Sequence, residues 1–377
     1  MAVPFYQHGL GQRELDAIAE VFKGQILTTG EWVARFEKRF AEYLGAKQAL
    51  GVTSCTGALH MSLLAWDIGP GDEVITTPFT FIASSTAIME AGARPVFVDV
   101  EEDTGNLDAV RVEAAITPRT KAILPVHLYG QMCDMKALRA IADRHGLALF
   151  EDGAHCVEGE REGIKPGQLG DTASFSFYAT KNLTCGEGGA LVWNDESRSK
   201  RLNLLRLHGM NKMAADRARE GYTHWDMTLL GWKYNMDNIQ AAMLLPQMDS
   251  IEENRTRRER VAAWYEEELA GIPGLTLPVT RPATRHARHL FPVLIGDGKR
   301  DAVIAHLQEA GIGCMVNYRA IHTLSFFREA LKYPEDAFPV ALKLGAMVLS
   351  LPFYPTLDRD EVREVAREIR KALAGRR

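Results

Sequence analysis

The sequence has few cysteines, no long apolar run and no large excess of charge of either sign. Its five cysteines among 377 residues are scattered without a CxxC pair, which argues against a disulfide framework or a structural zinc site. No stretch of 18 apolar residues occurs, and residues 1–13 contain no uninterrupted apolar segment such as a signal peptide needs. We therefore expect a complete mature chain in the reducing cytoplasm, without a membrane span.

The charge balance narrows the choice of partners. There are 44 lysines and arginines against 49 aspartates and glutamates, which gives a formal net charge of −5. This balance supplies no basic surface for a nucleic acid or for anionic lipid. We expect small-molecule substrates, and neither nucleic acid nor membrane as a partner.

Length and composition predict two structural units. The hydrophobic content of 46% is that of a soluble globular protein, and 377 residues exceed the size at which a single core stops growing. We assign residues 1–245 to an N-terminal arm and a large domain, and residues 246–377 to a spine helix and a smaller α+β domain. Pro246 predicts a kink or a break in the spine near Leu245. In the smaller domain, strands are predicted at 290–295 and 315–318, and helices at 300–310 and 360–373.

Apolar runs alternate with helical patterns between residues 48 and 193. This alternation is typical of an α/β domain with a mostly parallel sheet. Seven strands are predicted, at residues 49–52, 73–77, 95–99, 122–126, 148–151, 172–176 and 189–193. Crossover helices are predicted at 58–66, 82–91, 107–115 and 135–144. Ligands of such sheets bind at the carboxyl ends of the strands, so candidate binding and catalytic residues are expected there.

Three strand ends carry candidate chemistry. Residues 53–57 place hydroxyls and a glycine at a helix start, which can hold a phosphate or simply cap the helix. Asp152 and His155 follow the fifth strand; the carboxylate can pair with a protonated ring nitrogen or lie in a solvated turn. Ser176 and Lys181 follow the sixth strand. Most lysines are surface charges, but a desolvated lysine has a lowered pKa and can form a Schiff base with an aldehyde.

Together these groups meet the requirements of pyridoxal 5′-phosphate (PLP) chemistry. The lysine would hold the aldehyde, Asp152 would keep the pyridine nitrogen protonated, and the helix start would hold the phosphate. His286 and His289 are spaced i, i+3 with no third ligand nearby, so no metal site is predicted.

Eight segments, in chain order, carry a family resemblance: LTTG (27–30), GPGDEVITTPFTF (69–81), PVFVDVEEDTGNLD (95–108), AITPRTKAILPVHLYGQ (115–131), FEDGAHCVEG (150–159), GDTASFSFYATKNLTCGEGGAL (170–191), LRLHG (205–209) and GWKYNMDNIQAA (231–242). Over essentially its whole length the chain resembles the fold-type-I PLP-dependent aminotransferases of the DegT/DnrJ/EryC1/StrS group, which aminate nucleotide-linked keto sugars. KNLTCGEGG (181–189) and YRAIH (318–322) resemble the branch that makes 4-amino sugars from UDP-linked 4-keto sugars such as pentoses or 6-deoxyhexoses.

The resemblance implies roles for individual residues. Lys181 would link to PLP and move the proton, Asp152 would pair with the pyridinium, and His155 would lie near the ring hydroxyl. Asn235 would reach the phosphate from the neighbouring subunit of a homodimer, with Lys233 as the alternative because some members place the asparagine there. The remaining cofactor contacts would be Thr56, Gly57, Ala58, Phe81 and Ser176.

The resemblance also implies the substrates. L-Glutamate would donate the amino group, the cofactor would cycle through pyridoxamine 5′-phosphate (PMP), and the keto sugar would accept the nitrogen. Candidate substrate contacts are His127 and Tyr129 at a strand end, Arg319 and His322 in the smaller domain, and, with less support, Arg206 and His208. Three alternatives stay open: amination at C3, a PMP-dependent sugar dehydratase, and a non-catalytic sugar-nucleotide-binding regulator. Lys181 disfavours the dehydratase, because related dehydratases carry histidine in its place.

Overall fold

A seven-stranded sheet forms the centre of the computed structural model, which describes residues 2–211 and 224–374. Its strand order is β1-β8-β7-β5-β4-β2-β3. The strands are β1 (Gln48–Val52), β2 (Glu73–Thr76), β3 (Arg94–Phe97), β4 (Thr120–Leu124), β5 (Ala148–Asp152), β7 (Thr172–Ser176) and β8 (Gly189–Trp193). All seven predicted strands are present, each within two residues of its predicted ends.

The sheet is mostly parallel, as predicted. Strands β7, β5, β4, β2 and β3 run in one direction, and β8 pairs antiparallel with both β7 and β1. Asp152 lies opposite Ser174 in the β5–β7 register. The two strand ends that carry the candidate site are therefore adjacent.

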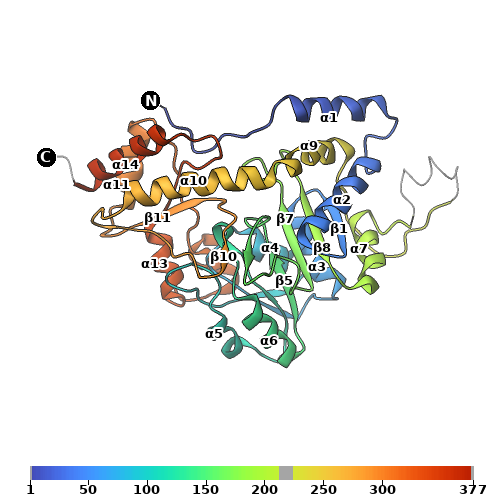
Figure 1. The fold of residues 1–377 in the computed structure, drawn as a ribbon. Helices are drawn as coiled ribbons and strands as arrows, with labels where there is room; N and C mark the ends of the chain where they lie inside the picture. The colour runs from blue at the N-terminus through green and yellow to red at the C-terminus, as the bar shows by residue number, and fades with distance from the viewer. Residues whose placement is uncertain (1, 212–223, 375–377) are drawn as a thin grey trace.

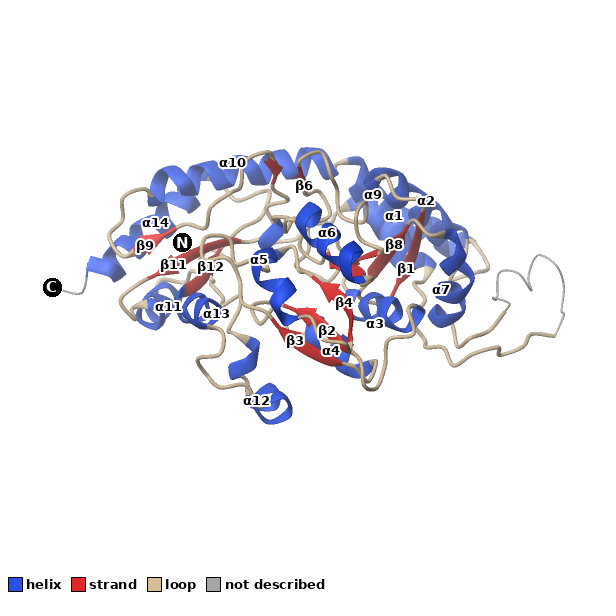
Figure 2. Cartoon of the chain, turned by 90° about the horizontal axis from the view of Figure 1, so that it is seen from below, coloured by secondary structure: helices blue, strands red, loops and turns tan. Residues whose placement is uncertain are grey.

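Helices cover both faces of this sheet (Figure 2). One face packs against α3 (Cys55–Ala65), α4 (Ala83–Glu90) and α7 (Ser199–Arg206). The other packs against α2 (Glu31–Leu44), α5 (Ala109–Val112), α6 (Met135–His145) and α9 (Asn238–Asp249). The amphipathic helix α1 (Gln12–Lys23) lies against α9. None of the helices in the described part of the chain is long and apolar enough to cross a membrane.

A long helix, α10 (Ile251–Leu269), connects the large domain to the C-terminal unit (Figure 1). Of the two predicted outcomes near Leu245, the break is absent, because Pro246 lies inside α9 and the helix ends at Ser250; a kink there stays a prediction. Pro246 removes one intrahelical hydrogen bond, and its ring crowds the carbonyl of Ala242. The helix continues through it because Leu244, Leu245 and Met248 are buried in the core.

The C-terminal unit is built around a three-stranded antiparallel sheet. Strand β11 (Phe291–Ile295) lies between β12 (Val348–Leu351) and β9 (Leu275–Thr276). Its helices are α11 (Arg300–Glu309), α12 (Ser325–Leu331), α13 (Pro339–Met347) and α14 (Arg359–Ala374). The strand predicted at 315–318 is absent apart from one bridge between Met315 and Ser350. That segment leaves the sheet, because the carbonyl of Asn317 accepts the hydroxyl of Tyr129 from the large domain.

The N-terminal arm differs from the predicted domain boundary. Val3 hydrogen-bonds to Gly311 and Gly313 and is fully buried in the core of the C-terminal unit. From there the arm runs back to α1 on the large domain (Figure 1). The first residues therefore belong with the smaller unit rather than with residues 10–245.

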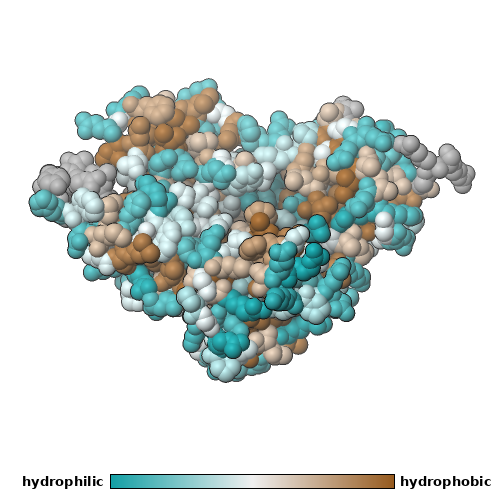
Figure 3. Space-filling model, turned by 180° about the vertical axis from the view of Figure 1, so that it is seen from behind, coloured by the Kyte–Doolittle hydropathy of each residue, from teal (hydrophilic) through white to brown (hydrophobic). Residues whose placement is uncertain are grey.

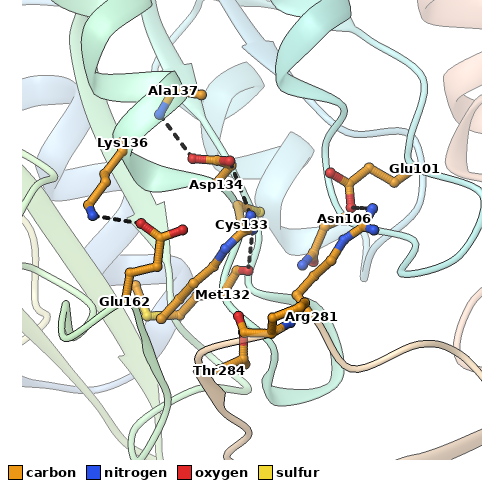
Figure 4. Close-up of polar contacts among 12 residues, drawn as sticks. Glu101, Asn106, Met132, Cys133, Asp134, Lys136, Ala137, Glu162, Arg281 and Thr284 are labelled. Carbon is orange, nitrogen blue, oxygen red and sulfur yellow. Dashed lines mark hydrogen bonds and ion pairs between the residues drawn. The ribbon is translucent and has the colours of Figure 1, made fainter.

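The segment between β9 and β11 is tied back to the large domain. Strand β10 (Thr284–Arg285) pairs with β6 (Glu160–Arg161), and Arg281 contacts Glu101 at 3.1 Å and Asp103 at 2.9 Å (Figure 4). This attachment carries residues 286–289 back toward the carboxyl ends of β5 and β7.

Candidate active site

Asp152 ends β5 and is buried among hydrogen-bond donors. The Ser84 hydroxyl donates to Oδ2 at 2.7 Å, and the Ala154 N–H donates to Oδ1 at 3.1 Å. The Cys55 thiol lies 3.7 Å from Oδ1. These contacts fix the carboxylate at the edge of the sheet, where parallel α/β sheets bind their ligands.

Lys181 follows β7 in the loop that precedes β8, and its side chain is half-buried. Burial lowers the pKa of its amine from 10.5 to about 8, although the charges of Asp152 and Cys55 oppose the shift. About a tenth of the amine is therefore unprotonated at pH 7, far more than for a lysine with the ordinary pKa. This is the form that attacks an aldehyde.

Two buried imidazoles lie beside the lysine. His289 Nε2 is 3.4 Å from the amine nitrogen, and the His155 ring lies 4.4 Å from the His289 ring, centroid to centroid. The backbone N–H of Tyr129 donates to His155 Nδ1, so His155 Nε2 carries the proton toward the Tyr318 hydroxyl at 3.2 Å. Burial, reinforced by the charge of Lys181, lowers the pKa of both rings well below the usual range.

The predicted phosphate-binding turn begins α3. Ser54 is its N-cap: its Oγ accepts the N–H of Gly57 at 3.0 Å, and its carbonyl accepts the N–H of Ala58 at 3.1 Å. The structure therefore differs from the prediction, because the cap already uses the N–H groups of Gly57 and Ala58. The first-turn N–H groups of Cys55 and Thr56 have no acceptor within a helix. They, with the Thr56 hydroxyl, are the groups of this turn best placed for an anion.

Two further predicted cofactor contacts lie near this cluster. Ser176 ends β7, and its hydroxyl oxygen accepts the Tyr178 N–H at 3.3 Å, so its own proton is available to a ligand. Phe81 is 54% exposed, and its ring lies 5.9 Å from that of Tyr318. An exposed aromatic face at this position suits stacking against a planar ring.

Asn235 and Lys233 act together in this structure. Asn235 pairs with Val52 at the end of β1, and its amide donates to the Thr29 hydroxyl at 2.8 Å. The Lys233 amine donates to Asn235 Oδ1 at 2.6 Å. The two residues therefore form one polar pair beside the LTTG segment, and which of them reaches the phosphate stays a prediction.

The structure does not bring His127 and Tyr129 to the site as exposed substrate contacts. His127 is fully buried, with its Nε2 2.7 Å from Glu151 Oε2. Tyr129 is also buried, and its hydroxyl is used by Asn317. Its backbone, in the left-handed region at φ 58°, donates to His155 and accepts the N–H of His289 at 3.0 Å. Tyr129 thus supports the two imidazoles.

The remaining substrate candidates are dispersed. His322 is buried in the C-terminal unit, where its Nε2 lies 2.9 Å from the carbonyl of Glu335 and its ring packs edge-on against Phe338. Arg319 is exposed. Arg206 is buried in an ion pair with Glu37, and His208 is exposed on the neighbouring loop. The pairing and burial of His127, His322 and Arg206 are those of structural residues.

The sequence interpretation missed four residues of the site: Ser84, Cys55, His289 and Tyr318. Ser84 and Cys55 lie in the first turns of helices that follow strands, so the strand-end rule could have found them. His289 and Tyr318 come from the C-terminal unit, more than 100 residues from Lys181 in the sequence. No local signal places them here.

A cavity of about 400 Å³ opens beside Lys181. It lies between the N-terminal arm, the Lys181 loop and the start of α10. Its polar lining includes Tyr6, Gln7, Asn182, Asn254, Arg257 and Arg258. This volume is within the range of small-molecule sites.

The chemistry of these groups fits PLP. The lowered pKa of Lys181 gives an amine able to condense with an aldehyde, and the buried Asp152 carboxylate supplies the partner of a protonated ring nitrogen. The start of α3 supplies unsatisfied N–H groups and a hydroxyl for the phosphate.

Comparisons with known proteins agree with this arrangement. The model of the DegT/DnrJ/EryC1/StrS aminotransferase family matches residues 9–370. The chain is 40% identical over 379 residues to the spore coat polysaccharide biosynthesis protein SpsC of Bacillus subtilis, covering 99% of this chain and 97% of SpsC. The structure of S. venezuelae DesV in complex with a ketimine intermediate is 39% identical, covers 98% of both chains and superposes with a TM-score of 0.90. The PLP form of the sugar aminotransferase Spr1654 from Streptococcus pneumoniae is 27% identical, covers 99% of both chains and has a TM-score of 0.93.

Proposed function

The chain belongs to the DegT/DnrJ/EryC1/StrS aminotransferase family and is a PLP-dependent sugar aminotransferase, and from this premise we propose that it transfers the amino group of L-glutamate to a nucleotide-linked keto sugar. The sugar is a 4-keto pentose or a 4-keto-6-deoxyhexose, by resemblance to the 4-amino-sugar branch. One observation carries the proposal: the amine of Lys181, with a pKa of about 8, lines a 400 Å³ cavity and feels the charge of the buried Asp152 carboxylate.

The positions of Asp152 and Lys181 indicate a role for each residue. When bound, the cofactor supplies an aldehyde, which condenses with a primary amine and releases water, and a protonated ring, which takes up the electrons left on the carbon that loses its proton. Asp152, held by Ser84 and Ala154, keeps a negative charge where that ring nitrogen would lie. Lys181 would hold the cofactor through its amine and, once free of it, would move a proton with its neutral amine.

The first turn of α3, with Thr56 and with Ser176 from β7, is proposed to hold the phosphate. Phe81 is proposed to cover one face of the ring, and His155 to lie at the ring hydroxyl. The Nε2–H of His155, directed toward Tyr318, makes this imidazole a hydrogen-bond donor. These roles require no metal ion.

The nucleotide part of the substrate needs contacts outside the cluster around Lys181 and Asp152. Arg257 and Arg258 line the cavity, and the Arg257–Glu253 pair is exposed and so is worth little in free energy. Arg257 can therefore exchange its carboxylate for a diphosphate, which its guanidinium matches geometrically. Arg319, which is exposed, is a second candidate. The role of the B. subtilis relative in spore coat polysaccharide synthesis supports a product destined for a polysaccharide.

A homodimer with shared active sites is proposed for the assembly. Apolar side chains are exposed on and beside α1: Leu15 is 60% exposed, Phe22 61% and Leu27 48%. Figure 3 shows a hydrophobic patch at the upper left of the face that it draws. Leu27 belongs to the LTTG segment, next to the Thr29–Asn235 hydrogen bond. A second copy seated on this surface would bring Asn235 toward its neighbour's phosphate. The five cysteines are all free, which is consistent with the proposed cytoplasmic setting.

The test is incubation of the PLP-loaded protein with L-glutamate and a panel of UDP-, GDP- and dTDP-linked keto sugars. Formation of 2-oxoglutarate together with an amino sugar nucleotide from one panel member is the expected result. The Lys181→Ala variant is the control and should form neither product. Formation of 2-oxoglutarate without any aminated sugar would overturn the proposed acceptor, and loss of a sugar hydroxyl instead of amination would favour the dehydratase.

A further inference from the structure

A continuous chain of polar side chains runs from the cavity wall to the amine of Lys181. Arg258 donates to one carboxylate oxygen of Glu158, and the Asn182 amide nitrogen donates to the other at 2.9 Å. Asn182 then contacts His289, and His289 contacts Lys181, each at 3.4 Å. Arg258, Glu158 and His289 are all buried, so water does not substitute for these partners.

The hydrogen bonds of Asn182 determine the tautomer of His289. The amide nitrogen of Asn182 faces two acceptors, Glu158 Oε2 and, at 3.0 Å, the carbonyl of Ala287. The atom that faces His289 Nδ1 is therefore the amide oxygen, which can only accept. His289 Nδ1 must carry the hydrogen, and Nε2 presents a lone pair to the lysine amine.

His155 has the opposite arrangement although its ring is in contact with that of His289. Its Nδ1 accepts the Tyr129 N–H, so its Nε2 is the protonated nitrogen. Besides His289, the groups whose charge acts on or responds to the amine of Lys181 are Asp152 on β5, Cys55 on α3 and His155. His289 is the one that approaches within hydrogen-bond distance in the described residues.

We propose that His289 is a positioning residue for Lys181: its Nε2 accepts one N–H of the amine whenever the lysine is free of the cofactor, and Asn182 fixes the tautomer that makes this possible. A neutral amine held in this way keeps its own lone pair for the carbonyl carbon or the proton that it must take. The role concerns the lysine alone and is independent of which sugar the enzyme aminates.

The reaction of the apoenzyme with PLP tests this role without any substrate. The rate at which the visible absorbance of the Lys181-linked cofactor develops is measured by stopped flow across the pH range around 8. We expect His289→Leu to slow this rate about 10-fold, the factor that one ordinary hydrogen bond carries. His289→Gln, whose amide oxygen can replace Nε2, should restore most of the rate. His286→Leu, on the same segment without contact to Lys181, is the matched control.

The affinity for PMP separates positioning from a merely structural role, because PMP binds without joining the lysine. We expect the Kd for PMP to change less than about twofold in His289→Leu. A parallel loss of PMP affinity, an unchanged linking rate in His289→Leu, or a His289→Gln variant as slow as His289→Leu would each overturn the proposal. These results do not depend on sugar turnover, so a wrong keto-sugar assignment would leave them unaffected.

Asn182 gives a second, independent test. If it acts through the tautomer of His289, Asn182→Ala should slow linking several-fold in the wild-type background and have little effect in the His289→Gln background, since an amide has no tautomer to fix. Equal effects in both backgrounds would show that Asn182 acts by another route and would overturn its part of the proposal.

Discussion

Glu151 and Asp152 are neighbours on β5, and both carboxylates are buried, yet only one of them belongs to the site. Glu151 Oε2 lies 2.7 Å from His127 Nε2, and its Oε1 accepts the N–H groups of Gly167 and Gly170. The second ring nitrogen of His127 accepts a backbone N–H. Every polar side-chain atom of this pair therefore has a protein partner.

Asp152 points to the opposite face of the sheet, as successive strand residues do. There it meets Ser84, Cys55 and the amine of Lys181, whose one hydrogen-bond contact within the described residues is His289. Burial, charge and a nearby histidine are thus common to both sides. The functional side differs because, in the described residues, the Lys181 amine and the N–H groups of Cys55 and Thr56 keep hydrogens without a protein acceptor, and a ligand can engage them.

The largest expected effect is that of Asp152→Asn. The variant keeps the shape but loses the charge opposite the ring nitrogen, so the rate of the glutamate half-reaction should fall by about 10²- to 10³-fold. The measurement is the single-turnover conversion of the PLP form to the PMP form. PLP affinity should fall much less than the rate, and an equal loss of both would mean that Asp152 merely binds the cofactor.

Glu151→Gln should show the reverse pattern. Its amide would place a donor against the His127 N–H or a glycine N–H, which costs about 1–3 kcal/mol of unfolding free energy. The Tm should fall, while the rate per bound PLP stays within a factor of about three. Glu162→Gln is the control: its pair with Lys136 is exposed and should matter little (Figure 4). A large loss of rate in Glu151→Gln would show that Glu151, like Asp152, supports the reaction, so that the two sides of β5 would not differ in function.

The sequence was sufficient for the sheet and for the residues at its edge. Each strand is a short apolar run between turn signals, and the strand-end rule selected Asp152, Ser176 and Lys181 directly. The same rule also selected His127 as a substrate contact, but the side chain of His127 is fully buried. Strand β4, which precedes His127, is buried at its last three residues, so the sequence carries no alternation that tells which face a residue at its end serves.

Long-range contacts account for the rest of what the sequence could not predict. His289 reaches the site because β10 pairs with β6, and Val3 joins the C-terminal core across some 300 residues of sequence. The position of the spine break was missed for a different reason. One lost hydrogen bond at Pro246 is a small cost beside the burial of its neighbours in the core.

Ser84→Ala sharpens the comparison at the level of a single hydrogen bond. Its hydroxyl donates to Asp152 Oδ2 at 2.7 Å, and hydrogen bonds to charged groups are the stronger kind. We expect about a 10-fold lower rate of the glutamate half-reaction with little change in Tm. Ser85→Ala is a matched control on the same helix, because the Ser85 hydroxyl is buried without a partner in the described residues. Equal rates in the two variants would show that Ser84 does not support Asp152.

Lys181 should also cause a pH dependence of apoenzyme stability. Its pKa is about 8 in the folded chain and 10.5 ordinarily, so between these values the unfolded chain binds more protons and stability rises with pH. Below about pH 8 both states are protonated, and the cost of burying the charge is constant. Urea midpoints of wild type and Lys181→Met should therefore diverge in favour of wild type from about pH 8 upward. Parallel curves would mean that the amine of Lys181 is as well solvated as that of a surface lysine. The lowered pKa of Lys181 would then no longer distinguish its side of β5 from the side that carries the Glu151–His127 pair.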